Sequence, residues 1–183
     1  GLDIIGLAKT GSGKTFAYVF PAIVHILNQP YLEPGEGPIV VILVPTRELA
    51  NQVANEARKF CKKCGISCLS IIGGHGKYEM GKELQKGVEA VIATPGRFLE
   101  FLSGKKAVTN CQRCTMVILD EADRMLEMGF EEQVNSVLSQ IRPDRQILMF
   151  SATFKRRVEV EQCLECSLRR RIGNCEKICT ECN

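Results

Sequence analysis

The chain has 183 residues, of which 45% are apolar and 25% charged, and its formal net charge is +3. This length suits one domain that buries its own core, and the composition is that of a globular protein, not a disordered one. A charge of +3 is too small to demonstrate a nucleic-acid partner. No run approaches the roughly 20 apolar residues of a membrane span, so we expect no membrane partner. We see no signal peptide, and the ten cysteines suggest reduced thiols inside a cell.

The first pattern in chain order is a glycine-rich segment between an apolar run and a helix. The apolar run covers residues 4–7, the glycine-rich segment AKTGSGKT covers residues 8–15, and the helical pattern begins near Phe16. This order of strand, glycine-rich turn and helix, with Gly-Lys-Thr at the end of the turn, is typical of a phosphate-binding loop. Ala8 is a departure, because the strict motif has glycine at this position. A plain strand-to-helix connection is the alternative.

The residue types of this segment suit a nucleotide phosphate together with a magnesium ion. Gly11 and Gly13 allow consecutive N–H groups to point at one anion, and the dipole of the following helix favours the same place. Lys14 would reach the terminal phosphates, and the Thr15 hydroxyl would hold Mg²⁺. The predicted cofactor-binding residues are Thr10, Gly11, Ser12, Gly13, Lys14 and Thr15.

Strand and helix patterns then alternate along the chain. Helices are predicted over residues 16–28, 47–63, 78–86, 97–102, 121–128, 131–141 and 155–168, and strands over 39–44, 66–72, 88–93, 116–119, 146–150 and 170–172. Residues 29–38, with three prolines and two glycines, are predicted to form a loop. The alternation predicts an α/β fold with a parallel sheet and helices on both faces, whose ligands lie beyond the carboxyl ends of the strands.

An acidic tetrad, Asp120-Glu121-Ala122-Asp123, follows the apolar run at residues 116–119. In a protein with a phosphate-binding loop, a carboxylate at the end of a buried strand, here Asp120, usually holds Mg²⁺. The adjacent Glu121 could polarise water for attack on the γ-phosphate. Acidic residues also favour the start of a helix through its dipole, which is the alternative interpretation. The catalytic candidates are Lys14, Asp120 and Glu121.

Six motifs, in this order, resemble those of the DEAD-box RNA helicases, in their first RecA-like domain. They are AKTGSGKT at residues 8–15, PTRELA at 45–50, Gly73-Gly74, TPGR at 94–97, DEAD at 120–123 and SAT at 151–153. The segments RMLEMGF and RPDRQ are also similar to this family, and to its members that act in pre-mRNA splicing. The resemblance implies a RecA-like P-loop NTPase domain over residues 1–174, followed by a divergent Cys-containing tail at 175–183.

The resemblance also assigns roles to individual residues. It implies ATP and Mg²⁺ as cofactors, with Thr15 and Asp120 as the Mg²⁺-holding residues. Asp123 is expected to pair with Ser151 and Thr153, and this segment would couple the nucleotide site to closure of two helicase domains. The implied RNA-binding residues are Thr46, Arg47, Gly73, Gly74, Thr94, Gly96 and Arg97.

The chemistry of this RNA-binding set can be argued independently. Each motif follows a strand, so backbone N–H groups and short hydroxyls converge at one edge of the sheet. The glycines allow a phosphate backbone to approach, and Arg47 and Arg97 supply charge-assisted hydrogen bonds. With few aromatic residues nearby, we expect contacts to the sugar-phosphate chain of single-stranded or duplex RNA without regard to base sequence. A turn at Pro95-Gly96 and a solvated helix start at Arg47 are the alternatives.

The resemblance further implies what the full-length protein does. We expect RNA-dependent ATP hydrolysis coupled to local duplex unwinding or RNP remodelling, in the nucleus rather than the cytoplasm, with RNP or spliceosomal proteins as partners. The family's upstream adenine-reading element and its second RecA-like domain are not recognised in this sequence, so we expect the isolated domain to be nearly inactive. The alternatives are an inert adaptor that retains the fold and another P-loop ATPase such as a DNA helicase, which PTRELA and TPGR disfavour.

The cysteines raise a competing hypothesis, a zinc site. Four C-x-x-C pairs are present, at Cys61/Cys64, Cys111/Cys114, Cys163/Cys166 and Cys179/Cys182. Two of them fall in predicted helices, whereas zinc ligands of this spacing favour turns, and the tail cysteines lack an obvious fourth ligand. We interpret most of the cysteines as small hydrophobic residues and predict no stoichiometric zinc. His25 in a predicted helix and His75 in a loop add no ligand set.

Overall fold

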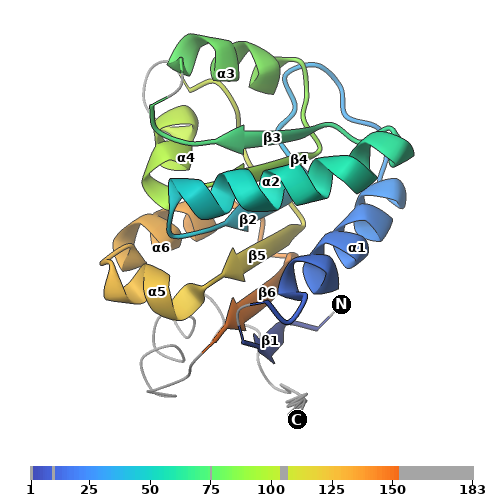
Figure 1. Cartoon of the computed structure of the whole chain (residues 1–183). Coiled ribbons are helices and arrows are strands. Elements are labelled where there is room, and N and C mark those ends of the chain that lie inside the picture. The colour runs from blue at the N-terminus through green and yellow to red at the C-terminus, as the bar shows by residue number, and fades with distance from the viewer. Residues whose placement is uncertain (1, 10, 75, 104–106, 153–183) are drawn as a thin grey trace.

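The computed structural model describes residues 2–9, 11–74, 76–103 and 107–152. Within these ranges six strands form one sheet, and every neighbouring pair is parallel, in the order β1-β6-β5-β2-β4-β3 (Figure 1). The strands are β1 (Ile4–Leu7), β2 (Val40–Leu43), β3 (Cys68–Ile71), β4 (Ala90–Ala93), β5 (Met116–Asp120) and β6 (Gln146–Ser151). The parallel sheet expected from the strand-helix alternation is confirmed.

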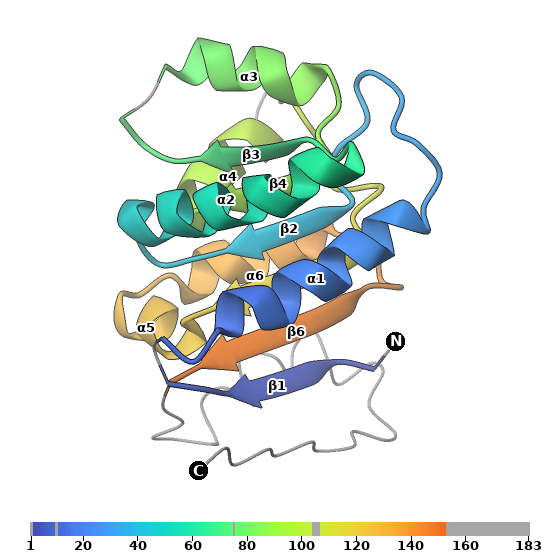
Figure 2. The same cartoon turned by 45° about the vertical axis from the view of Figure 1, so that its right-hand side comes forward.

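Helices cover both faces of this sheet. They are α1 (Lys14–Leu27), α2 (Arg47–Cys61) with the short 3₁₀ turn η1 (Lys62–Cys64), α3 (Lys77–Gln85), α4 (Pro95–Leu102), α5 (Ala122–Glu127) and α6 (Glu131–Gln140). The side chains of α1 and α2 belong to one hydrophobic core, and those of α3 to α6 belong to the other. Figure 2 shows α1 and α2 in front of the sheet and α6 behind it. In the described part of the chain, no helix is long and apolar enough to cross a membrane.

The central strands explain why two cores form. β2 has the sequence VVIL and is buried along its whole length. Its successive side chains point to opposite faces, so Val41 and Leu43 join the core beneath α4 to α6, while Val40 and Ile42 join the core beneath α1 and α2. A continuous apolar run is therefore the expected pattern for a strand that is covered on both sides.

Several helix boundaries differ from the predicted ones for local reasons. α1 begins at Lys14 rather than Phe16, directly after Gly13 in the left-handed region. α4 begins at Pro95 rather than Arg97, because proline suits the first turn of a helix. The predicted helix 47–63 ends as η1, followed by Gly65 with a positive φ of 71°. The predicted helix 155–168, the predicted strand 170–172 and the tail lie outside the described residues.

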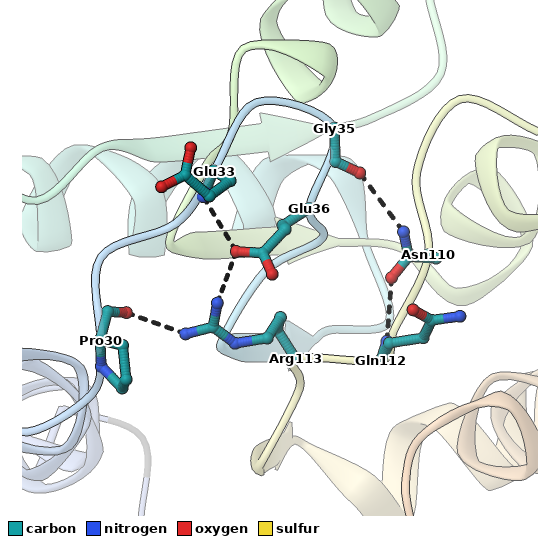
Figure 3. Close-up of polar contacts among 7 residues, drawn as sticks. All are labelled: Pro30, Glu33, Gly35, Glu36, Asn110, Gln112 and Arg113. Carbon is teal, nitrogen blue, oxygen red and sulfur yellow. Dashed lines mark hydrogen bonds and ion pairs between the residues drawn. The ribbon is translucent and has the colours of Figure 1, made fainter.

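The predicted loop at residues 29–38 directly precedes β2, at the amino ends of the strands, and polar contacts hold it there (Figure 3). Arg113 donates a hydrogen bond to the carbonyl of Pro30 over 2.8 Å and forms an ion pair with Glu36. The same Glu36 carboxylate accepts the N–H of Glu33 over 2.9 Å. One arginine therefore ties this loop to the segment that leads into β5.

A second contact brings the two segments closer still. The Asn110 amide donates to the carbonyl of Gly35 over 3.4 Å, and its oxygen accepts the N–H of Gln112 over 3.0 Å. A Cβ atom added at Gly37 would lie 1.7 Å from the Asn110 carbonyl oxygen. Residue 37 must therefore be glycine for the backbones to approach this closely.

Candidate nucleotide and RNA site

The motifs meet because all strands of the sheet are parallel. The carboxyl ends of the six strands lie at one edge, which the arrowheads mark in Figure 1, and each motif follows one of these ends. The structure thereby brings the predicted nucleotide-binding and RNA-binding segments to a single edge of the sheet. Two predicted site residues, Thr10 and Thr153, lie outside the described residues.

The glycines of the phosphate-binding loop have left-handed backbones. Gly11 has a φ of 82° and Gly13 a φ of 86°. A Cβ atom at either position would meet nothing within 4 Å, so these glycines are needed for their backbone angles and not for space. The first bond of α1 runs from the Phe16 N–H to the Gly13 carbonyl over 3.0 Å. The N–H groups of Lys14 and Thr15 precede this bond and are the donors that a helix start offers to an anion.

Lys14 is the buried lysine of this loop. Its residue is only 8% exposed, and its Nζ atom is buried with no hydrogen-bond partner among the described residues. A buried ammonium group is costly unless an anion accompanies it. The Lys14 side chain therefore fits a bound phosphate, which would supply the anion.

Asp120 ends β5 as a buried carboxylate, 3% exposed. Its Oδ2 accepts a hydrogen bond from the Tyr18 hydroxyl over 2.8 Å, and its Oδ1 accepts the Glu121 N–H over 3.0 Å. Burial raises the pKa of this carboxyl above its usual range, while the Tyr18 hydrogen bond and the charge of Lys14 act in the opposite direction. A buried carboxylate at the mouth of a phosphate-binding loop, with the half-buried Thr15 nearby on α1, is a donor set that fits Mg²⁺.

Glu121 has an unusual backbone. It is the one residue other than glycine with a positive φ, 54°, in the part of the chain that the structure describes. The left-handed conformation of Glu121 explains why α5 begins at Ala122, one residue later than predicted. The Glu121 carboxylate forms an ion pair with Arg124 over 3.3 Å. Such strain in a non-glycine residue costs on the order of 1–3 kcal/mol and often accompanies a functional site.

Two of the predicted RNA-binding motifs share one surface. A Cβ atom added at Gly73 would lie 2.6 Å from Nη2 of Arg47, and one at Gly74 would lie 3.4 Å from Nη1. The Arg47 guanidinium therefore rests on the backbone of Gly73-Gly74. Thr46 caps α2, because its Oγ1 accepts the Leu49 N–H over 3.2 Å.

The third predicted RNA-binding motif is held by its own contacts. Arg97 forms an ion pair with Glu100 over 2.6 Å, and its guanidinium lies 5.5 Å from the ring centre of Phe101. Lys77 reaches the same Glu100 over 3.0 Å and, as the largest cause, lowers the pKa of that carboxyl. A Cβ atom at Gly96 would meet none of the described residues within 4 Å, so packing against them does not require glycine there. The ion pairs of Glu100 with Lys77 and Arg97 were not predicted from the sequence.

The predicted coupling segment lies beside the phosphate-binding loop. Ser151 is fully buried at the end of β6, and its carbonyl accepts the Ala8 N–H over 3.0 Å. The first residue of the phosphate-binding loop is thereby bonded to the first residue of the SAT motif. Asp123, in the first turn of α5, accepts the Arg124 N–H over 3.0 Å. Its pairing with Ser151 and Thr153 stays a prediction.

Tyr18 is a polar residue of the site that sequence reasoning missed. Its side chain is fully buried, and its ring centre lies 5.3 Å from that of Phe150. Burial, reinforced by the nearby Asp120 charge, raises the pKa of Tyr18 far above its ordinary value, so it stays a neutral donor. The available signal was its place on α1, one helical turn after Lys14 and Thr15, on the face of the helix that points to the sheet.

The described cysteines do not form a metal site. Cys61, Cys64, Cys68, Cys111 and Cys114 are all free, and the described residues hold no group of three or more His, Cys, Asp or Glu that could bind a metal ion. His25 instead pairs with the Thr115 hydroxyl over 2.7 Å. The remaining cysteines lie outside the described residues, so the absence of zinc stays a prediction.

Comparisons with known proteins agree on one family. A model for DEAD/DEAH box helicases matches residues 1–160. DEAD-box ATP-dependent RNA helicase 20 of Oryza sativa subsp. japonica is 55% identical over 159 residues, which are 87% of this chain and 32% of that protein. Probable ATP-dependent RNA helicase DDX17 of Homo sapiens is 52% identical over 180 residues, which are 96% of this chain and 24% of that protein.

Solved structures lead to the same family. The yeast DEAD-box splicing factor Prp28 is 35% identical with a TM-score of 0.79, over 87% of this chain and 38% of that one. A DEAD box protein from the hyperthermophile Methanococcus jannaschii is 34% identical with a TM-score of 0.76, over 90% of this chain and 42% of that one. The sequence thus spans about a quarter to a third of the length of the two curated relatives.

Proposed function

The chain belongs to the DEAD/DEAH box helicase family, and from this premise we propose that it is the ATP-binding part of an RNA helicase. The observation that carries the proposal is the buried Lys14 ammonium at the start of α1, which has no hydrogen-bond partner among the described residues and lies near the buried Asp120 carboxylate. Relatives of this chain are named ATP-dependent RNA helicases, which favours ATP as the nucleotide.

The residues of the site suggest separate roles in binding phosphate, holding Mg²⁺ and activating water. Lys14 and the N–H groups that open α1 bind the phosphates, and Thr15 and Asp120 would hold Mg²⁺, which when bound neutralises phosphate charge. Glu121 orients the attacking water and accepts its proton. This scheme needs the Glu121 carboxylate to leave its ion pair with Arg124, a 3.3 Å contact in which the arginine side chain is exposed to solvent.

RNA would bind along the same edge of the sheet. Arg47, resting on Gly73-Gly74, offers its guanidinium to a phosphate, while Thr46, Thr94, Gly96 and Arg97 complete the surface. These groups recognise the sugar-phosphate chain and carry no information about base sequence. The bound RNA, single-stranded or duplex, is therefore expected to be of any sequence.

The wider role follows from the family and the lengths of the relatives. We place this domain beside a second RecA-like domain in a longer protein that unwinds short RNA duplexes or remodels RNP particles. The likeness to a yeast splicing factor supports spliceosomal partners and a nuclear location.

The test is nucleotide binding to the purified chain, measured by titration calorimetry with ADP and ATP in the presence of Mg²⁺. Lys14→Ala should abolish most of the binding, because it removes the charge that meets the phosphates. Lys59→Ala, which changes an exposed lysine of α2, is the matched control and should bind as the original chain does. Unchanged binding in the Lys14→Ala variant would overturn the assignment.

A further inference from the structure

The Tyr18 hydroxyl fixes the orientation of the Asp120 carboxylate. The hydroxyl donates to Oδ2 over 2.8 Å, while the Glu121 N–H donates to Oδ1 over 3.0 Å. With both oxygens engaged, the carboxylate has a single orientation at the end of β5. The Glu121 N–H belongs to the backbone, so no side-chain substitution removes it. Of the two hydrogen bonds to Asp120, only the one from Tyr18 can be removed by mutation.

Tyr18 also connects Asp120 with Thr15. The two residues lie three positions apart on α1, one turn of the same helix face. The Thr15 side chain therefore lies on the same side of α1 as the ring whose hydroxyl bonds to Asp120. Tyr18 thus contacts Asp120 and neighbours Thr15 on α1, the two residues whose side chains would hold Mg²⁺.

The ring of Tyr18 has little freedom to move. It packs against Phe150 of β6, at 5.3 Å between ring centres and 52° between ring planes. Phe150 in turn lies over Gly6 of β1, where an added Cβ would come within 2.7 Å of the phenylalanine ring. The position of the hydroxyl is therefore set by the sheet itself.

We propose that Tyr18 is a positioning residue that orients Asp120 against Thr15 and thereby strengthens Mg²⁺ binding at the nucleotide site. The inference rests on the proposed function, because it assumes that Thr15 and Asp120 face the nucleotide's Mg²⁺. A carboxylate that is oriented in advance loses less freedom when a cation arrives. Loss of a hydrogen-bond partner behind a metal-holding group typically lowers metal affinity roughly 10- to 100-fold.

The experiment measures how ADP binding depends on Mg²⁺ concentration, by calorimetry on the purified chain. In Tyr18→Phe, the Mg²⁺ concentration that gives half of the maximal gain in ADP affinity should rise roughly tenfold. ADP affinity without Mg²⁺ should stay within about twofold, because the phosphates still meet Lys14 and the loop. Tyr78→Phe, an exposed tyrosine on α3, is the control and should change neither value.

Two further variants separate positioning from folding. In an Asp120→Asn background, Tyr18→Phe should produce no additional change in Mg²⁺ dependence, because the oriented group is already gone. Phe150→Leu keeps the hydroxyl and loosens the ring, so it should give a smaller rise in the same direction, and it serves if Tyr18→Phe does not fold.

Three outcomes would overturn the inference. Unchanged Mg²⁺ dependence in Tyr18→Phe would show that the hydroxyl does not act on the cation, and equal losses with and without Mg²⁺ would show a purely structural role. If the original chain binds ADP with no Mg²⁺ dependence at all, the proposed Mg²⁺ site itself fails, which the other two results would not indicate.

Discussion

Because Gly73 has no side chain, the Arg47 guanidinium can lie directly against its backbone. The Arg47 guanidinium occupies the space in which a Cβ of residue 73 would lie, at 2.6 Å from its Nη2 atom. The arginine is exposed, so its place on the surface is set by this contact and by the start of α2. An alanine at residue 73 would displace the guanidinium without removing its charge.

We therefore predict that Gly73→Ala weakens RNA binding several-fold by way of Arg47. A charge-assisted hydrogen bond to a phosphate depends on the position of the guanidinium, and fluorescence anisotropy with labelled single-stranded RNA at low salt would measure the loss. Gly76→Ala is the control, since its nearest neighbour would be the Glu79 side chain at 3.6 Å. In an Arg47→Ala background Gly73→Ala should have no further effect, and additive losses would contradict the mechanism.

The N-cap of α2 gives a prediction at the scale of an element. Thr46→Ala removes the hydrogen bond from the Leu49 N–H and should lower the free energy of unfolding by about 1 kcal/mol. Thr46→Ser keeps the hydroxyl oxygen and should restore most of that loss. Urea denaturation followed by circular dichroism measures both. A Thr46→Ala protein as stable as the original would show that this cap contributes nothing.

The loop before β2 packs closely against the segment before β5. Gly37 is buried where a Cβ would overlap the Asn110 carbonyl, and Arg113 ties the same pair of segments from the other side. This contact precedes the β2–β5 pairing, in which Val40 lies opposite Met116. It therefore helps to set the register of the two central strands.

Gly37→Ala should destabilise the fold by about 1–3 kcal/mol, because both backbones must move to admit the methyl group. The comparison is Gly96→Ala, where an added Cβ meets nothing within 4 Å. That change lies in the first turn of α4 and should cost no stability. Thermal unfolding of the two variants side by side would test the prediction, and equal melting temperatures would refute it.

At the scale of the whole molecule, the described site supplies only part of what phosphoryl transfer needs. In the proposed scheme Lys14 binds phosphate and Glu121 orients water, but the transition state also needs positive charge on the departing phosphoryl group. In related mechanisms an arginine from another domain or protein contributes about 10³–10⁵ in rate. In the proposed scheme a second RecA-like domain would supply this charge.

We therefore predict that the 183-residue chain alone hydrolyses ATP very slowly and that RNA does not stimulate it. Steady-state phosphate release, with and without single-stranded RNA, would be compared between this chain and a protein that contains both RecA-like domains. Only the two-domain protein should respond to RNA. RNA-stimulated turnover of similar rate in the isolated chain would show that the necessary charges are already present.

Much of the fold could be predicted because it depends on patterns that are local in sequence. The buried run at residues 40–43 and the alternation with helices were enough to predict a parallel sheet, and a parallel sheet gathers the motifs at one edge. The Tyr18–Asp120 hydrogen bond could not be predicted, because it joins residues 102 positions apart whose distance only the tertiary structure sets. The Lys77–Glu100 ion pair, 23 positions apart, was missed for the same reason, whereas the Arg97–Glu100 pair and the positive φ of Glu121 are local features that no sequence pattern signalled.

The pairing of β1 fixes the order in which the site can form during synthesis. Among the described strands β1 pairs with β6 alone, and the Gln146 side chain bonds to the Leu2 carbonyl across 144 positions of sequence. At a synthesis rate of 5–20 residues per second, roughly 7–30 s separate the two strands as they leave the ribosome. A nascent chain that has already made its phosphate-binding loop should therefore be unable to retain nucleotide until β6 has emerged and paired with β1.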